Sequence, residues 1–173
     1  INLLATPGID TINNSRLVGQ IFDILEDRAD TLYIVTTPDK EAGSGDFADE
    51  IPEVDETVSN FKDAELHSGY AATYYPWVKI EDNGEYLYIP ATRDVVRNMA
   101  ESDNSNTTMN LAPAGLTRGK IKAIRARKNL KLDECDELYE ANINPVRTYA
   151  QEGVIVMGQK TLRESDDLLN RID

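Results

Sequence analysis

The chain has 173 residues with a formal net charge of −13 at pH 7, and 40% of its residues are hydrophobic. This length suits one well-packed domain and is short for two, so residues 1–173 are expected to form a single domain. One cysteine and one histidine exclude an intrachain disulfide and a Cys/His zinc site. No apolar run approaches the roughly 20 residues that span a membrane, so no membrane partner is expected.

The charge is unevenly distributed along the chain. Residues 1–68 carry 15 acidic and 4 basic residues, whereas residues 69–173 carry 16 and 14. An acidic chain repels phosphate, so no nucleic-acid partner is expected. A basic strip without an intervening acid contains Arg118, Lys120, Lys122, Arg125, Arg127, Lys128 and Lys131.

The first part of the chain predicts a strand, a helix and a second strand. A strand over residues 2–5 precedes a Pro-Gly turn, and a helix is expected from Asn14 or Ser15 to about Arg28. The continuous apolar residues 32–35 predict a strand buried on both faces, as in a parallel sheet covered by helices. The apolar residues at helical spacing are Leu17, Ile21, Ile24 and Leu25, and Val18 and Phe22 widen that face.

The next stretch predicts a surface loop and a second helix. Residues 39–53 are acidic, and their Gly-Ser-Gly at residues 43–45 lacks the Gly-Lys-Ser/Thr ending of a phosphate-binding loop. A helix is expected over residues 54–67, with Val58, Phe61 and Leu66 facing inward.

The most aromatic stretch of the chain contains its single tryptophan. Residues 74–80 are aromatic and β-branched, which predicts a strand, although Pro76 belongs at a strand start, an edge or a bulge. Asp-Asn-Gly at residues 82–84 then predicts a turn, with a hairpin over residues 78–89.

The remainder of the chain predicts shorter elements. We expect a helix over about residues 93–100, a polar loop over residues 101–108, a helix capped by Asp133, an extended segment from Asn144 and a strand at residues 154–157. The loop lacks the closing Glu of a calcium site. Gly158 predicts a bulge or a close backbone approach, and Ser165 would cap a last helix. The apolar residues of the basic strip follow neither the alternation of a strand nor the spacing of a helix cleanly.

Neither Cys135 nor His67 predicts a catalytic group. Carboxylates surround Cys135 in the sequence and would raise the pKa of its thiol, so a small core residue is expected. His67 is interpreted as a favourable partner for the dipole at a helix end.

Four motifs resemble, in order, the conserved domain of contractile tail sheath proteins of bacteriophages and related injection machines. They are Gly-Tyr-Ala-Ala-Thr-Tyr-Tyr-Pro-Trp at residues 69–77, Leu-Ala-Pro-Ala-Gly at 111–115, Ile-Asn-Pro-Val-Arg-Thr-Tyr at 143–149, and Gly-Val-Ile-Val-Met-Gly-Gln-Lys-Thr-Leu at 153–162. The resemblance covers roughly residues 68–173 and is weaker over residues 1–40. Two departures are Met157, where the family usually has Trp or Tyr, and Lys160, where it often has Arg.

The resemblance implies an α/β fold with a mixed β-sheet core flanked by helices, in a fragment that lacks the terminal arms. It implies a structural subunit without catalytic, cofactor or metal sites, which polymerises into a helical tube around an inner tail tube and contracts. The implied partners are other copies, the inner tube protein, and baseplate and tail terminator proteins, in a virion assembled in the host cytoplasm. The core signature comprises Tyr74, Tyr75, Pro76, Trp77, Pro113, Gly115, Asn144, Pro145, Arg147, Gly153, Gly158 and Thr161.

The uneven charge suggests a contact between copies. We hypothesise that Arg125, Arg127 and Lys128 face the acidic surface of a neighbouring subunit, whereas pairing within the chain is the simpler alternative.

Two other functions are considered. One is a sheath subunit of a bacterial secretion system or a contractile bacteriocin. The other is an α/β enzyme, which would have to rely on Asp, Ser or Lys and is disfavoured.

Overall fold

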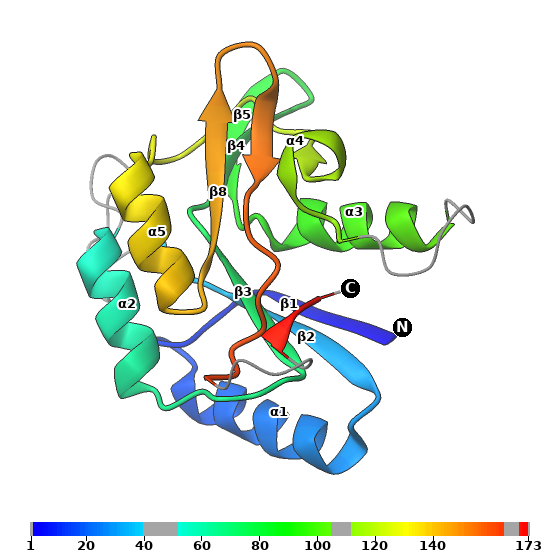
Figure 1. The fold of residues 1–173 in the computed structure, drawn as a ribbon, viewed down its shortest axis with the longest axis vertical. Helices are drawn as coiled ribbons and strands as arrows, with labels where there is room; N and C mark the ends of the chain where they lie inside the picture. Colours follow the sequence, from blue (N-terminus) through cyan, green and yellow to red (C-terminus); the bar gives the residue numbers. More distant parts are fainter. Residues whose placement is uncertain (1, 40–51, 105–111, 165–169, 173) are drawn as a thin grey trace.

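The computed structural model describes residues 2–39, 52–104, 112–164 and 170–172 (Figure 1). The strands are β1 (Asn2–Asp10), β2 (Thr31–Thr36), β3 (Ala71–Tyr75), β4 (Val78–Asp82), β5 (Glu85–Ile89), β6 (Lys120–Ile121), β7 (Arg125–Ala126), β8 (Asn144–Tyr149) and β9 (Gly153–Val156). The helices are α1 (Ser15–Arg28), α2 (Val54–Asp63), α3 (Thr92–Asn104), α4 (Gly115–Arg118) and α5 (Leu132–Glu140).

The strands form a mixed six-stranded sheet and a smaller three-stranded sheet. The six-stranded sheet has the order β1-β2-β3-β8-β9-β6, with parallel pairing from β1 to β8 and antiparallel pairing from β8 to β6. The three-stranded sheet has the order β5-β4-β7 and is antiparallel. The predicted α/β fold with a mixed sheet core flanked by helices is confirmed.

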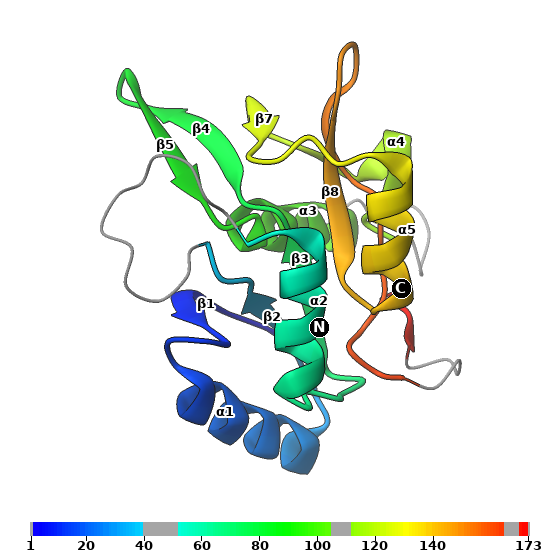
Figure 2. The ribbon, with the colours of Figure 1, turned by 90° about the vertical axis from the view of Figure 1, so that its left-hand side faces the viewer.

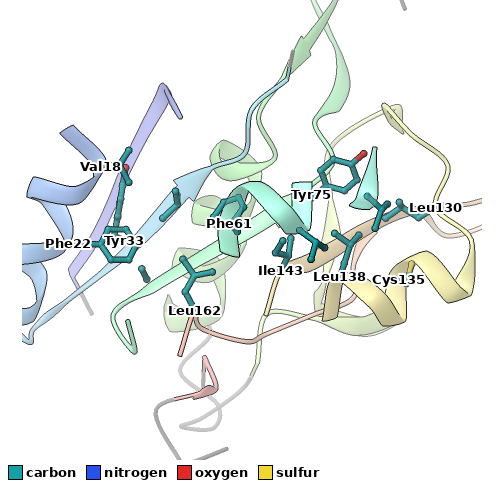
Figure 3. Close-up of a cluster of buried hydrophobic side chains, with 14 of the residues drawn as sticks. Val18, Phe22, Tyr33, Phe61, Tyr75, Leu130, Cys135, Leu138, Ile143 and Leu162 are labelled. Carbon is teal, nitrogen blue, oxygen red and sulfur yellow. The ribbon is translucent and has the colours of Figure 1, made fainter. Parts of the chain in front are cut away.

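The two faces of the central sheet bury separate apolar clusters, because successive side chains of a strand point to opposite faces. Helices α1, α2 and α5 cover one face, where Phe22, Phe61 and Leu138 pack around Tyr33 and Tyr75 (Figure 3). Helix α3 and strand β4 cover the other face. Tyr33, Ile34 and Val35 of β2 and all of β3 are buried, as expected for strands enclosed by two layers, whereas Leu32 is partly buried.

The aromatic stretch does not form one strand, contrary to the prediction. Strand β3 ends at Tyr75, the Tyr75–Pro76 bond is cis, and β4 begins at Val78 in the other sheet. Pro76 carries no backbone N–H, so it fits this crossing between sheets. The predicted hairpin is confirmed: β4 and β5 pair antiparallel, with positive φ at Asn83 and Gly84 as a type I′ turn requires.

The apolar face predicted for α1 is wider than the face that the helix buries. Its boundaries match the prediction, but the residues it buries are Val18, Phe22 and Leu25, whereas Leu17 and Ile24 are 43% and 57% exposed. Either side of the apolar stripe could cover the sheet, and the sequence carries no signal that selects one.

Four predicted boundaries were wrong. Strand β1 continues through the predicted Pro-Gly turn as far as Asp10, with a shift of register between Ala5 and Asp10. Helix α2 ends at Asp63, because Glu65 has a left-handed backbone, so His67 lies beyond the helix, with its Nδ1 3.6 Å from the Glu164 carboxylate. Helix α3 continues through polar residues as far as Asn104. Helix α5 has Lys131 rather than Asp133 at its N-cap, since the Glu134 carboxylate accepts the Lys131 backbone N–H at 2.7 Å.

The remaining predictions concern the basic strip and segments that are not described. The strip forms two short strands in different sheets, since β6 pairs with β9 and β7 pairs with β4. The glycine-containing part of the acidic loop, the polar residues 105–108 and the Ser165 cap lie outside the described residues.

Candidate subunit interface

The signature residues meet at Asn144, a fully buried residue at the start of β8. The Asn144 Nδ2 donates to the backbone oxygens of Thr73 at 3.0 Å and Lys160 at 2.7 Å, and its Oδ1 accepts the Lys160 N–H at 2.7 Å. One amide side chain therefore joins β3, β8 and the segment after β9, and it satisfies backbone groups that would otherwise be buried without partners.

Gly158 lies directly against this amide. A Cβ at Gly158 would stand 2.5 Å from the Asn144 Oδ1 and 3.0 Å from its Cα. The predicted close backbone approach is confirmed, and it explains why residue 158 carries no side chain.

The segment after Gly158 continues the sheet alongside β3. The Leu162 N–H donates to the Ala71 oxygen at 2.8 Å, and the Thr161 N–H donates to the Asn170 oxygen at 3.1 Å. Strand β8 pairs with Tyr74 and Tyr75, at the C-terminal end of β3. Asn144 thus lies where two segments share the same edge of one strand.

The aromatic signature residues anchor the neighbouring loops. Tyr75 donates its hydroxyl to the Pro52 oxygen at 2.7 Å, and Trp77 donates its indole N–H to the Thr37 oxygen at 2.8 Å. Burial raises the pKa of the Tyr74 and Tyr75 hydroxyls, so both stay neutral. Trp77 is only half-buried, between the two sheets rather than in a central strand.

The other signature residues shape turns and the sheet edge. Pro113 is buried, and Gly115 and Gly153 have positive φ at the start of α4 and at the β8–β9 turn. Pro145 accepts the Met157 N–H at 2.8 Å, and Arg147 stacks over the Tyr149 ring at 5.2 Å. The structure thus brings Tyr74, Asn144, Pro145, Gly158 and Thr161 together and leaves Pro113, Gly115 and Gly153 apart.

Two of the three proposed interface cations are paired within the chain. Arg127 forms an ion pair with Asp39 and lies over the Tyr88 ring at 4.8 Å, and its side chain is 7% exposed. Lys128 pairs with Glu53 and, at 3.1 Å, with Glu134.

These contacts set the protonation of the Lys128 cluster. Burial acts to lower the pKa of Lys128, but Glu53 and Glu134 raise it overall. The backbone N–H of Lys131 holds the pKa of Glu134 below its usual value, with help from Lys128. Pairing within the chain, the simpler alternative, therefore accounts for Arg127 and Lys128.

Arg125 differs from these two cations because it is exposed. Its guanidinium donates to the Tyr88 hydroxyl at 2.9 Å on the outer face of the β4–β5 hairpin, where Lys79 lies 4.2 Å from the Tyr86 ring centroid. The β4–β5 hairpin protrudes from the rest of the molecule (Figure 2). Arginine and tyrosine are enriched at protein–protein contact surfaces.

A basic groove lies beside this hairpin, with a cavity of about 610 Å³. Its lining residues are Ile80, Glu81, Asp82, Arg93, Arg97, Lys120, Ile121, Lys122, Ala123 and Ile124. Arg93 and Arg97 lie 3.1 and 3.2 Å from the carboxylate of Asp94, whose side chain is 1% exposed.

Two positioning residues were missed by the sequence reasoning. Asp94 holds the arginines of the groove, and the i, i+3 spacing of Asp94 and Arg97 could have indicated it. Asn98 donates to the Pro113 oxygen at 3.3 Å and the Arg118 oxygen at 2.6 Å, which fixes the signature turn against α3. Nothing in its local sequence identifies that long-range role.

Among the described residues, no cluster of three or more His, Cys, Asp or Glu side chains could hold a metal ion. None of the described helices combines the length and apolar character needed to cross a membrane. Cys135 is buried, and burial raises the pKa of its thiol, with nearby carboxylates adding and Arg147 opposing. The expectation of a small core residue is confirmed.

Sequence comparison finds similarity to phage tail sheath proteins. The chain is 30% identical over 100 residues to the tail sheath protein of Vibrio phage KVP40, which covers 57% of this chain and 14% of that relative. It is 29% identical over 127 residues to the tail sheath protein of Enterobacteria phage T4, which covers 68% of this chain and 18% of that relative. The chain thus spans less than a fifth of the length of these relatives, and no family model matches it.

Structure comparison finds the same architecture in contractile injection systems. A chain of the PVC sheath complex, an extracellular contractile injection system in its contracted state, matches 99% of this chain and 42% of its own length with a TM-score of 0.70 at 21% identity. A chain of the anti-feeding prophage baseplate matches 99% of this chain and 40% of its own length with a TM-score of 0.69 at 20% identity. The chain is thus similar in sequence to phage tail sheath proteins and has a fold found in the contractile injection systems.

Proposed function

We propose that the chain is the α/β core of a structural subunit of a contractile phage tail sheath. The observation that carries the proposal is the agreement between the sequence similarity to two phage sheath proteins and the fold match over nearly the whole chain. The buried signature around Asn144 supports it, because these residues stabilise the fold rather than forming a reactive site.

In this function the protein polymerises as a helical tube around an inner tail tube and contracts to drive that tube through the host envelope. The extended assembly would store the energy, and subunits would move nearly as rigid bodies without nucleotide hydrolysis. The two-sided core around β2 and β3 supports rigid-body movement, since tightly packed interiors deform little.

The partners in this proposal are other copies of the chain, the inner tube protein, and baseplate and tail terminator proteins. The protein would reside in the virion tail after assembly in the host cytoplasm. The sequence relatives from two phages favour a phage tail over a bacterial secretion sheath or a bacteriocin.

The interface hypothesis is retained in a narrower form. Arg125 is proposed to contact a neighbouring copy, because it is exposed and lies among aromatic side chains. Arg127 and Lys128 are better assigned to stabilising their own subunit, because both pair with acids of the same chain.

Electron microscopy of the purified full-length protein tests the proposal. We expect helical tubes, in contracted form or around a co-expressed inner tube. Arg125→Glu should leave the melting temperature of the subunit nearly unchanged and reduce tube formation or contraction. A full-length protein that remains monomeric with its inner tube partner present would argue against the function.

A further inference from the structure

Helix α1 presents an apolar stripe to solvent. Leu17 and Ile24, two turns apart on one side of the helix, are 43% and 57% exposed. Asp23 and Asp27 are exposed on the adjoining side of the same helix. We call these four residues the α1 face. Single exposed apolar side chains are common on protein surfaces, and Arg16 is exposed on the same side of α1 as Asp23 and Asp27. The α1 face therefore indicates a contact only where a surface of complementary chemistry exists.

The basic groove has the complementary chemistry. Lys120 and Lys122 are exposed and form no ion pair with the residues that the structure describes, while Ile124 is 47% exposed beside them. The side chains of Arg93 and Arg97 remain 46% and 43% exposed although they contact Asp94. The groove therefore offers an exposed apolar residue bordered by cations.

The two surfaces lie toward opposite ends of the molecule. Helix α1 lies at one end of the long axis, and the β4–β5 hairpin and the elements around the groove lie toward the other (Figures 1 and 2). Neither surface can therefore reach the other within one chain. Two complementary surfaces at opposite ends of a subunit produce a head-to-tail contact, which repeats as an open helix or a ring.

We propose that the α1 face of one copy docks on the basic groove of the next copy. Asp23 and Asp27 would meet Lys120 and Lys122, and Ile24 and Leu17 would cover Ile124. This inference rests on the proposed function, and it names the surfaces through which copies associate.

The groove itself argues for a protein carboxylate surface rather than a phosphate ligand. Glu81 and Asp82 lie in its lining beside the apolar residues Ile80 and Ile121. These carboxylates repel any anion, but a phosphate group concentrates about −1.5 to −2 charges at one point, whereas two aspartates on a helix place single charges apart and can each meet one lysine. In this proposal the lysine pair and the aspartate pair contribute specificity to the contact between copies.

Reciprocal charge reversal in the full-length protein tests the pairing. Asp23→Lys with Asp27→Lys, and separately Lys120→Glu with Lys122→Glu, should each raise the concentration needed for assembly about tenfold or more, because two attractive pairs become repulsive. The protein carrying all four substitutions should assemble again close to the wild-type concentration. Sedimentation measures the concentration needed for assembly of each variant, and electron microscopy shows whether tubes form.

The matched control is Asp136→Lys with Glu140→Lys, two exposed acids on α5 with the same spacing. This control should assemble as the wild type does. Ile24→Gln is a second variant without a charge change, and it should also weaken assembly. Thermal melting checks that each variant is folded.

The outcomes separate this inference from the proposed function. Wild-type tubes together with charge-reversed variants that assemble normally, or with a fourfold variant that fails to recover, would overturn the pairing while leaving the function in place. A wild-type protein that forms no tubes would count against both.

Discussion

The chain contains two regions that are stabilised in different ways. The parallel region, residues 2–75, pairs three successive strands and covers them with helices, and its strands β2 and β3 are almost entirely buried. The antiparallel region, residues 78–162, contains shorter strands in two sheets, joined by hairpins and by hydrogen bonds from single side chains. Examples are the hydrogen bonds that Asn144 donates to Thr73 and Lys160 and that Asn98 donates to Pro113. The Thr148 hydroxyl likewise accepts the Ala126 N–H at 2.7 Å.

This difference indicates where substitutions should cost most. Apolar burial is spread over many residues, so a core of this kind tolerates exchanges that preserve volume. A buried amide that satisfies several backbone groups has no substitute of similar shape and hydrogen-bonding capacity. We therefore expect the antiparallel region to depend on a few identifiable polar residues.

The largest effect is expected at Asn144. Asn144→Ala removes three hydrogen bonds and leaves backbone groups of Thr73 and Lys160 buried without those partners. The free energy of unfolding should fall by about 3–5 kcal/mol. Chemical denaturation measures it, with Asn13→Ala, which removes one exposed hydrogen bond to Asp10, as the control. A loss below about 1 kcal/mol would show that the fold does not depend on the hydrogen bonds of Asn144.

Arg127 gives the next effect. Arg127→Met leaves the carboxylate of Asp39, which is 10% exposed, without its guanidinium partner, and should cost about 3 kcal/mol. Arg125→Met, two residues away and exposed, should change subunit stability by less than about 0.5 kcal/mol. Equal losses in the two variants would contradict the assignment of Arg127 to the subunit interior and return it to the proposed interface.

Substituting one glycine in each region should change the stability by a smaller amount and in opposite directions. Gly158→Ala would place a Cβ 2.5 Å from the Asn144 Oδ1 and should cost about 1–3 kcal/mol. Gly19→Ala lies in the interior of α1, where the new Cβ would meet no heavy atom within 4 Å other than those of its chain neighbours and of the helix backbone, and it should instead stabilise the protein by about 0.5–1 kcal/mol. Denaturation measures both variants, and stability changes of the same sign would contradict this prediction.

The parallel region could be predicted well from the sequence, because its signals are long and periodic. The α1 boundaries and the buried strand β2 followed from apolar spacing. The side of α1 that packs on the sheet could not be predicted, since Leu17 and Ile24, which are exposed, are as apolar as Val18 and Leu25, which are buried.

In the antiparallel region, Asp-Asn-Gly predicted the β4–β5 hairpin, but the shortest strands could not be predicted. Strands of two residues, such as β6 and β7, exist because neighbouring strands pair with them, so their own sequence holds no period to detect. The signature residues could be named from the resemblance, but the role of Asn144 depends on Thr73 and Lys160, which are distant in sequence. The ion pairs of Arg127 and Lys128 likewise needed the fold to bring Asp39 and Glu53 close.

The smallest effect is expected from a titration that links the two regions. Glu134 on α5 accepts the Lys131 N–H at 2.7 Å and lies 3.1 Å from Lys128, which also pairs with Glu53 before α2. Because the pKa of Glu134 is lowered in the folded protein, its charged form stabilises the fold above the pKa of the unfolded chain. That stabilisation is lost as the pH falls through the lowered folded pKa.

Glu134→Gln should therefore lower the melting temperature near pH 7 and make progressively less difference as the pH falls below about 4, the ordinary range of a glutamate. The difference at neutral pH should correspond to less than about 1 kcal/mol, because solvent screens a pair near the surface. Thermal melting of both proteins across this pH range measures it, with Glu137→Gln, an exposed change on the same helix, as the control. A difference between wild type and Glu134→Gln that stays constant with pH would show that packing, rather than the charge of Glu134, joins α5 to the parallel region.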